Sequence, residues 1–368
     1  MPILLEEDLR RPLPRMYRVR QQFDETRLED VAGTVRAEFA KPEIRALVKP
    51  GMRIAVGVGS RGIQNLYTIV ETTVNSLKEL GAEPFIVSAM GSHGGGTEEG
   101  QREVLAGYGI TEERLGVPVV TTVDTVYLGN CANGRPVWFD RAAYEADLIV
   151  PINRVKLHTD FVGPIQSGLC KMLVIGLGNH KGCSAVHEEA PEVFADAIEE
   201  TARLILQKAP VGFGIAILEN AYDKTYAVEA VPAEHLVERE KELVQIAKGN
   251  MPYIMLDEAD VIVCGAIGKD ISGAGFDPNI LGRSSVLKQF VLHIPRYQRL
   301  VLCDVTPASH GNGIGVGLFD VITKKVAEQL DLESMYANAI ACNCLGDASV
   351  PCTVDDEETA IRVALKCC

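Results

Sequence analysis

Long apolar runs, signal-peptide features and an excess of basic residues are all missing from this sequence. No apolar stretch reaches the roughly 20 residues that a membrane-spanning helix requires. The N-terminus, MPILLEEDLRRPLPR, lacks the basic start and apolar run of a signal peptide. The formal net charge is −14, whereas nucleic-acid binding needs clustered Lys and Arg. We therefore expect a cytoplasmic protein with neither a membrane nor a nucleic-acid partner.

Cysteines with the spacing of a metal site are also scarce. The ten cysteines are scattered, apart from a loose group at Cys342, Cys344 and Cys352 and the terminal Cys367 and Cys368. Reduced thiols are the expectation for a long chain without a secretion signal. A metal cluster at Cys342 and Cys344 is the weaker alternative, because the C-x-C spacing has no second half. The terminal pair lacks the basic linker typical of prenylation sites.

The composition is that of a folded globular protein. Hydrophobic residues make up 47% of the 368 positions and charged residues 23%. These fractions exclude a disordered or fibrous chain. A chain of this length can bury two separate cores.

Apolar runs alternate with amphipathic segments along the chain. Strands are predicted at 53–58, 85–89 and 147–151, and residues 172–175 are also strand-like in composition. Helices are predicted at 64–80, 97–105, 192–207 and 233–248. This alternation predicts an α/β fold with mainly parallel sheets flanked by helices.

Two short repeats indicate two domains. Residues 258–263 (EADVIV) resemble residues 145–150 (EADLIV), and Ser-His-Gly occurs at both 92–94 and 309–311. We predict an N-terminal α/β domain at 1–250 and a C-terminal α/β domain at 251–368, whose last segment could pack back on the first. Ligands of such sheets gather at the carboxyl ends of strands, so the active site is expected in the cleft between the domains.

A glycine motif suggests one function that the rest of the sequence does not support. Gly57-Val58-Gly59-Ser60-Arg61-Gly62 fits G-x-G-x-x-G between a strand and a helix, the pattern of dinucleotide binding. The next predicted strand has no acidic residue at its end to hold a ribose hydroxyl. A tight turn that presents Arg61 to an anionic group is the preferred interpretation. An NAD-dependent oxidoreductase that uses Gly57–Gly62 is the alternative.

Three of the seven histidines and one lysine share chemically capable surroundings. His93 and His158 each follow a predicted strand, and imidazoles can serve as acid and base near neutral pH. His187 begins or precedes a predicted helix. Lys171 lies beside an apolar run, where desolvation favours a neutral, reactive amine. Ordinary loop histidines, a surface lysine and a metal site all remain open on the residues alone.

The segment RVKLHTDFVGPIQSGLCKMLVIGLGNHKG, followed by His187, resembles the lactate racemase family, as do Ser-His-Gly at 92–94 and GKDISGAGFDPN at 268–279. The resemblance implies a nickel-pincer nucleotide (pyridinium-3,5-bisthiocarboxylic acid mononucleotide nickel). Lys171 would carry it covalently through a thioamide, and His187 would be the nickel ligand. His93 and His158 would be the acid–base pair.

The resemblance also implies the surroundings of the reaction. Arg61 would bind the carboxylate of a small anionic hydroxy acid, and Ser60, Ser167 and Gly168 would contact the cofactor. A hydride would leave the substrate carbon and return to either face, so that the enzyme racemises or epimerises a 2-hydroxy acid. Cofactor-synthesis proteins would be cellular partners. Neither the oligomeric state nor the particular substrate follows from the sequence.

The chain departs from lactate racemases proper in ways that concern the substrate. Ser60-Arg61-Gly62 replaces their usual Thr-Arg-Pro, and the single Trp138 lies in an expected hairpin rather than in the C-terminal domain. Their Tyr-Gln-x-x-Lys pattern is missing, so other second-domain residues are candidates for substrate binding: Lys269, Asp270, Asn279, Arg283 and His310. A polyol or a larger hydroxy acid is a plausible substrate. A non-catalytic small-ligand-binding protein is the third hypothesis.

Overall fold

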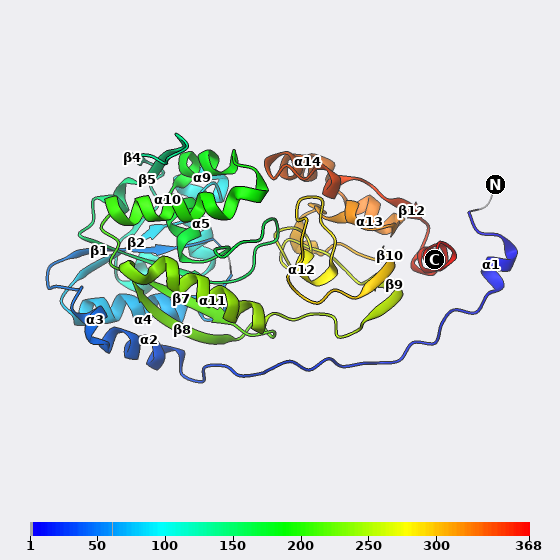
Figure 1. Ribbon diagram of the computed structural model, residues 1–368, viewed down its shortest axis with the longest axis horizontal. Coiled ribbons are helices and arrows are strands. Elements are labelled where there is room, and N and C mark those ends of the chain that lie inside the picture. Colours follow the sequence, from blue (N-terminus) through cyan, green and yellow to red (C-terminus); the bar gives the residue numbers. More distant parts are fainter. Residues whose placement is uncertain (1–2, 61) are drawn as a thin grey trace. The chain divides into compact units, whose positions relative to one another are not determined.

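The computed structural model describes residues 3–60 and 62–368. The chain divides into two compact units, each described here by itself. The larger unit comprises Asp24–Met251, and the C-terminal unit comprises Pro252–Cys368 together with residues up to Phe23. Both units consist of a mainly parallel sheet flanked by helices (Figure 1). The α/β class predicted from the sequence is confirmed.

The larger unit contains a six-stranded sheet in the order β3-β2-β1-β6-β7-β8. All neighbouring strands are parallel except β7 and β8. Its strands are β1 (Arg53–Val58), β2 (Glu83–Ser88), β3 (Val119–Val120), β6 (Leu148–Arg154), β7 (Phe213–Glu219) and β8 (Thr225–Pro232). The central strands are buried on both faces, which is why they appear in the sequence as continuous apolar runs rather than alternating ones.

Helices cover both faces of this sheet. They are α2 (Val31–Ala40), α3 (Pro42–Arg45), α4 (Leu66–Glu79), α5 (Glu98–Gly107), α6 (Glu112–Leu115), α7 (Arg141–Tyr144), α8 (Leu169–Lys171), α9 (Asn179–His187), α10 (Phe194–Lys208) and α11 (Leu236–Asn250). Helix α4 buries Ile69, Val70 and Leu77 completely against the core. The helix predicted at 64–80 contains α4.

The strand order changes direction between β1 and β6. The chain moves from β1 to β2 and β3 on one side, then crosses to β6 and β7 on the other. Loops that leave the carboxyl ends of β1 and β6 therefore diverge at the centre of the sheet. In open α/β sheets this switch point is the usual place for a ligand.

A separate antiparallel hairpin belongs to the larger unit. It consists of β4 (Thr125–Asn130) and β5 (Pro136–Asp140), and Trp138 lies on β5 as expected. The sequence prediction was wrong at 172–175, because Met172–Gly176 forms a π-helical turn between α8 and α9 instead of a strand. An apolar run of four residues does not distinguish a buried strand from a buried helical turn.

The C-terminal unit contains a four-stranded parallel sheet in the order β12-β11-β10-β9. Its strands are β9 (Glu258–Cys264), β10 (Arg296–Leu302), β11 (Val321–Thr323) and β12 (Cys352–Val354). Its helices are α1 (Glu6–Arg10), α12 (Pro278–Leu281), α13 (Lys324–Gln329), α14 (Leu332–Ala341) and α15 (Glu357–Lys366). A core around Leu300, Leu302 and Ile322 lies between the sheet and helices α12, α13 and α14, whereas α15 packs against a separate cluster that includes Val301 and Val321.

Residues 3–23 group with the C-terminal unit, whereas the sequence predicts them in the N-terminal domain. The cause is a set of polar contacts between α1 and α15. Arg362 donates to the carbonyl oxygens of Asp8 (3.1 Å) and Arg11 (2.7 Å), and Lys366 pairs with the Asp8 carboxylate. The last segment, α15, packs on the strands of the C-terminal unit.

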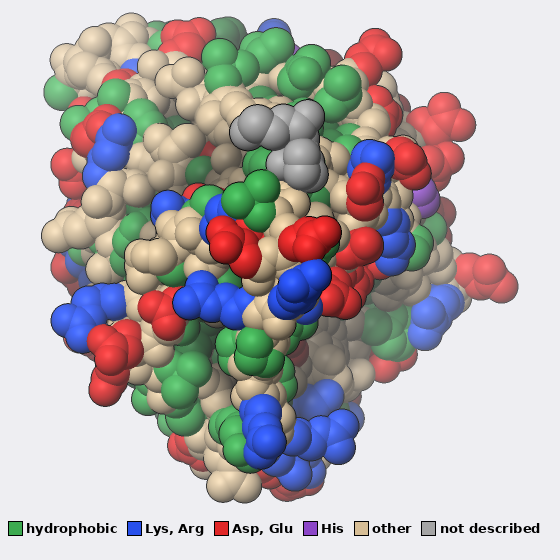
Figure 2. All heavy atoms as spheres, turned by 90° about the vertical axis from the view of Figure 1, so that its right-hand side faces the viewer, with side chains coloured by type: hydrophobic (Ala, Val, Ile, Leu, Met, Phe, Trp, Pro, Cys, Tyr) green, Lys and Arg blue, Asp and Glu red, His purple; other side chains and the backbone are tan. Residues whose placement is uncertain are grey.

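Charged side chains of both signs share the surface. On the face shown in Figure 2, Lys and Arg side chains lie among Asp and Glu side chains. Ion pairs such as Arg296–Glu258 (2.9 Å) are exposed, so each contributes little to stability. Within the described part of the chain, every helix is too short or too polar to span a bilayer.

Candidate active site

Three loops meet at the carboxyl edge of the central strands of the larger unit. The loop after β1 contacts the loop after β2, because the Ser60 hydroxyl hydrogen-bonds Nδ1 of His93. The β2 loop also packs on the segment that follows Lys171: a Cβ on Gly91 would lie 3.0 Å from the carbonyl oxygen of Ile175. Gly91 has a φ of +61°, so this close approach depends on glycine.

The loop after β6 brings His158 to Lys171. Nζ of Lys171 lies 2.5 Å from Nε2 of His158. The backbone N–H of Asp160 donates to Nδ1 of the same imidazole at 3.0 Å. The Phe161 ring stacks on the imidazole, with 4.2 Å between ring centroids. Both ring nitrogens and one face of the His158 imidazole therefore contact neighbouring groups, and these contacts fix the orientation of the ring.

His187 occupies the last position of α9 and precedes α10, the helix predicted at 192–207. Its Nδ1 lies 2.7 Å from the carbonyl oxygen of Cys183, one helical turn earlier. A carbonyl only accepts, so Nδ1 carries the proton and Nε2 keeps a lone pair. Metal-binding histidines are commonly oriented by such a bond from their other nitrogen.

A thiol lies beside this imidazole. Sγ of Cys183 is 3.5 Å from Nδ1 of His187 and 3.8 Å from the Ser92 hydroxyl. Burial opposes ionisation of the Cys183 thiol, but the hydrogen bonds with His187 and Ser92 hold its pKa below the ordinary value. The hydrogen bond with Cys183 raises the pKa of His187, although burial acts in the opposite direction. The two groups stabilise each other's charged forms.

Two phenylalanine rings lie between His158 and His187. Phe161, stacked on His158, lies 4.9 Å from the Phe194 ring, and Phe194 lies 5.2 Å from the His187 ring, centroid to centroid. Phe161 and Phe194 are both buried. Sequence reasoning did not single out these phenylalanines or Cys183. If the sequence analysis had predicted a helix that ends at His187, the i, i+4 spacing would have put Cys183 on the same helix face as His187.

A buried carboxylate holds the turn that carries Lys171. Glu240 of α11 is fully buried and accepts the backbone N–H of Cys170 at 2.8 Å. Burial raises the pKa of Glu240 to about 7, although hydrogen bonds from Cys170 and Leu169 lower it. A Cβ on Gly168 would lie only 2.5 Å from the Glu240 carboxyl group. Glycine at 168 therefore leaves room for the carboxylate at the start of α8.

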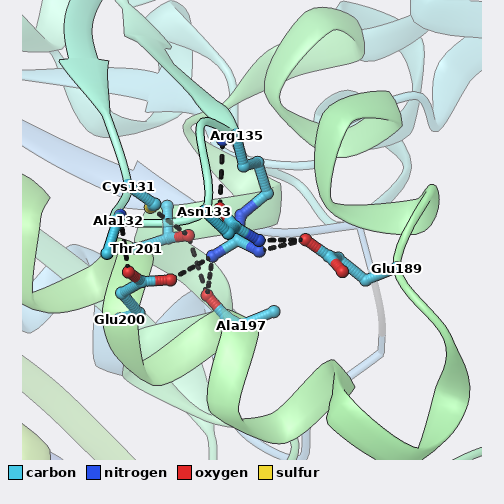
Figure 3. Close-up of polar contacts among 8 residues, drawn as sticks. All are labelled: Cys131, Ala132, Asn133, Arg135, Glu189, Ala197, Glu200 and Thr201. Carbon is cyan, nitrogen blue, oxygen red and sulfur yellow. Dashed lines mark hydrogen bonds and ion pairs between the residues drawn. The ribbon is translucent and has the colours of Figure 1, made fainter.

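A second buried charge holds the segment after His187 (Figure 3). The Arg135 side chain is only 4% exposed and pairs with Glu189 and, at 2.8 Å, with Glu200. It also donates to the carbonyl oxygen of Ala197 at 3.2 Å. Asn133, from the same hairpin, donates to Glu189 at 2.8 Å. The β4–β5 hairpin is thereby tied to the chain on both sides of Phe194.

The loop at Gly57–Gly62 lacks the geometry of a dinucleotide site. In that fingerprint a phosphate binds at the N-terminus of the following helix. Here α4 begins only at Leu66, and the N–H of Gln64 donates to the Glu219 carboxylate at 2.8 Å. This backbone N–H is therefore already paired and is not available to a phosphate. The arrangement weighs against the NAD alternative.

The other predicted site residues of the larger unit are Arg61 and the expected cofactor contacts Ser60, Ser167 and Gly168. Arg61 lies outside the described residues. The hydroxyl group of Ser60 contacts His93. Ser167 pairs through its backbone with Lys156, and the Gly168 carbonyl oxygen accepts from Asn153 at 2.8 Å. Ser167 and Gly168 thus shape the loop before Lys171 through their backbone.

The second-domain candidates lie in the C-terminal unit and fall into two groups. Lys269 and Asp270 follow β9: Nζ of Lys269 donates to the Gly273 carbonyl oxygen at 2.7 Å, and Asp270 accepts from the Thr306 hydroxyl at 2.5 Å. Arg283 pairs with Asp320 at 2.8 Å.

Other second-domain candidates have local roles in the backbone. The Asn279 side chain is buried beside the Asp277 cap, with Nδ2 of Asn279 3.2 Å from the Asp277 carboxylate. His310 ends a 3-10 turn with a φ of +47°. Arg283 and Asn279 therefore stabilise the fold of their unit, whereas Lys269 and Asp270 lie on a loop at the carboxyl edge of its sheet.

The side chains that the structure describes do not by themselves supply a complete metal site. Among the described residues, no three or more His, Cys, Asp or Glu side chains group in a way that could hold a metal ion. His187 offers a single nitrogen. A metal bound there would need further donors from its own ligand, which suits a metal that arrives within an organic cofactor.

The protein is of the α/β class, and its candidate site lies at the carboxyl edge of the six-stranded sheet, where the strand order changes direction. Residues 14–196 match the lactate racemase N-terminal domain, and the chain belongs to the lactate racemase family as a distant homologue. The structure of the lactate racemase apoprotein from Thermoanaerobacterium thermosaccharolyticum is similar, with a TM-score of 0.52 and 12% identity over 92% of this chain and 86% of that chain. This likeness shows the fold. A search of curated proteins finds no match.

Proposed function

We propose that the chain is a racemase or epimerase that acts on a 2-hydroxy acid or a related hydroxyl-bearing substrate. The contact between Lys171 and His158 carries the proposal, because it puts a cofactor-anchoring amine beside a proton-transfer group. Membership of the lactate racemase family supports an isomerase. A small anionic substrate remains compatible with a net charge of −14, since one local arginine suffices to bind a carboxylate.

The residues fit a lysine-tethered nickel-pincer nucleotide. Lys171 would hold its acyl arm, and Nε2 of His187, left with a lone pair by the bond to Cys183, would bind the nickel. When bound, the cofactor supplies a hydride acceptor. Ser60, Ser167 and Gly168 are the proposed cofactor contacts, and cofactor-synthesis proteins are the proposed cellular partners.

Proton transfer falls to His93 and His158. They come from the loops after two different strands, β2 and β6, and a pair of bases on two sides of a carbon is what inversion requires. One imidazole takes the hydroxyl proton and the other returns a proton when the opposite face is reduced. Arg61 is proposed to bind the carboxylate and fix the reacting carbon. Lys269 and Asp270 are proposed substrate contacts.

Expression with the cofactor-synthesis proteins tests this function. Intact-mass and metal analysis should find an adduct on Lys171 and about one nickel per chain, the single-site stoichiometry expected of a lysine-tethered cofactor. Lys171→Arg should lose the adduct. His93→Gln and His158→Gln should keep nickel if loaded and lose turnover on a panel of 2-hydroxy acids, measured by chiral chromatography. An unmodified Lys171 with no nickel retained would contradict the proposal.

A further inference from the structure

The hydrogen bonds of His158 determine which of its nitrogens carries a proton. The Asp160 N–H donates to Nδ1 at 3.0 Å, so Nδ1 is an acceptor and carries no proton. A neutral imidazole has one N–H, which must then be on Nε2. The alternative is a protonated Nδ1 that faces the Asp160 carboxylate. That separation is 4.0 Å, too long for a hydrogen bond.

The protonation of Lys171 follows from this tautomer. Nζ lies 2.5 Å from Nε2 of His158, and one of the two nitrogens must accept. Since Nε2 donates, Nζ offers its lone pair, which only a neutral amine has. A lysine ammonium would put two N–H groups against each other at this distance. Cys170 and Met172 on either side are both buried, and such surroundings also disfavour the charged form.

We propose that His158 keeps Lys171 as a neutral amine in the free protein, so that the chain forms its own bond to an incoming acyl group that is activated as a thioester, without a separate ligase. This inference rests on the proposed function, in which Lys171 is the tether. It gives His158 two successive roles. Once Lys171 is acylated its nitrogen no longer accepts a hydrogen bond, and the Nε2–H of His158 becomes available to donate to the substrate, so His158 is the acid of the pair and His93 the base.

The reaction is an ordinary acyl transfer. The lone pair of Nζ forms a C–N bond to the acyl carbon, and the bond from that carbon to its leaving group breaks. With a thioester the leaving group is a thiolate, which takes the proton that the nitrogen loses. The products are an amide on Lys171 and a free thiol, so no oxidant or reductant is needed.

A small acetyl thioester, S-acetyl-N-acetylcysteamine, probes this reactivity on the full chain purified without cofactor. Peptide mass spectrometry measures acetylation at Lys171 and at the exposed Lys208 of α10 in the same sample. An ordinary lysine is neutral in only about 1 molecule in 2,500 at pH 7. Lys171 should therefore react at least about tenfold faster than Lys208, even though it is partly buried.

Three variants separate the explanations. His158→Gln should lower the rate at Lys171 to that of Lys208 or below, with Lys208 unchanged. Asp160→Asn keeps the backbone N–H and removes the carboxylate, so the rate should stay within about twofold. His235→Gln, at an exposed histidine, controls for the loss of an imidazole. Circular dichroism of each variant checks that it is folded.

Three results would overturn the inference: a Lys171 no faster than Lys208, an unchanged rate in His158→Gln, or a large loss in Asp160→Asn. The probe contains neither nickel nor nucleotide. A negative result here therefore leaves the adduct and nickel measurements on the loaded protein free to support the proposed function. Rapid acetylation of Lys171 in a protein that retains no nickel would support the present inference and contradict the proposed function.

Discussion

The guanidinium of Arg135 and the carboxylate of Glu189 form an ion pair in which the arginine is almost wholly buried. Glu189 lies two residues after His187, so this pair holds the end of α9 against the β4–β5 hairpin (Figure 3). The hairpin is remote in sequence from every residue that the family resemblance implicates. Its contribution is to hold the chain segment that directly follows His187.

Replacing Arg135 with Met should destabilise the larger unit by about 3 kcal/mol, because removing one partner of a buried pair leaves the other charges unpaired. Chemical unfolding followed by fluorescence or circular dichroism measures this. Arg203→Met is the matched control. Arg203 also pairs with two glutamates but is 46% exposed, so its loss should cost less than about 1 kcal/mol. Equal effects would mean that burial of Arg135 is unimportant.

Alanine at 168 should destabilise the fold by about 1–3 kcal/mol, since its Cβ would lie within 2.5 Å of the Glu240 carboxyl group. Shortening Glu240 removes the obstacle. In the Glu240→Ala background the same change should cost at least about 1 kcal/mol less. Gly249→Ala is the control: nothing lies near its Cβ in α11, and it should stabilise by about 0.5–1 kcal/mol. Additive effects of G168A and E240A would rule out the contact.

Stability should depend on pH through Glu240. Burial raises its pKa from 4.5 to about 7. Its contribution is therefore fully present below pH 4.5 and is lost as the pH rises through 7.

Glu240→Gln has no such ionisation. Its unfolding free energy, relative to that of the unmodified protein, should increase by about 2–3 kcal/mol between pH 5 and pH 8. Glu234→Gln, on the exposed surface, controls for the loss of one negative charge. A difference between E240Q and the unmodified protein that does not change with pH would show that Glu240 does not titrate in this range.

Ser60→Ala should lower turnover of the loaded enzyme by about tenfold, less than the 100-fold or greater loss expected for His93→Gln. The Ser60 hydroxyl orients the His93 ring through Nδ1. Its removal should therefore have a smaller effect once His93 is already Gln. Chiral chromatography on the double and single variants measures the coupling. An S60A effect of equal size in both backgrounds would place Ser60 in a role independent of His93.

The strands and helices of the larger unit were predictable because their sequence periodicity is imposed by burial. The run at 53–58 coincides with β1, and the helix at 64–80 contains α4. The turn at Met172–Gly176 was not predictable in this way. A four-residue apolar run fits either a strand or a buried helical turn, and only packing against Gly59 and Gly91 distinguishes them.

The sequence indicated those candidate site residues whose side chains are themselves reactive. It did not indicate the residues that support them from distant parts of the chain. Histidines after strands marked the edge at which His93 and His158 lie. Nothing in the sequence predicts that Glu240 binds the backbone beside Lys171, since 69 positions separate the two residues. The roles of His93, His158, Lys171 and His187 remain predictions until the loaded protein is examined.

The N-terminal segment has a consequence for synthesis of the chain. Helix α1 leaves the ribosome well before its partner α15 has been made. At about 5–20 residues per second, the interval is on the order of half a minute. Throughout it, the segment that includes Met16, Tyr17 and Val19 lacks the unit with which it will associate. The N-terminal segment therefore remains without its unit while residues 24–251, which form the larger unit, are made.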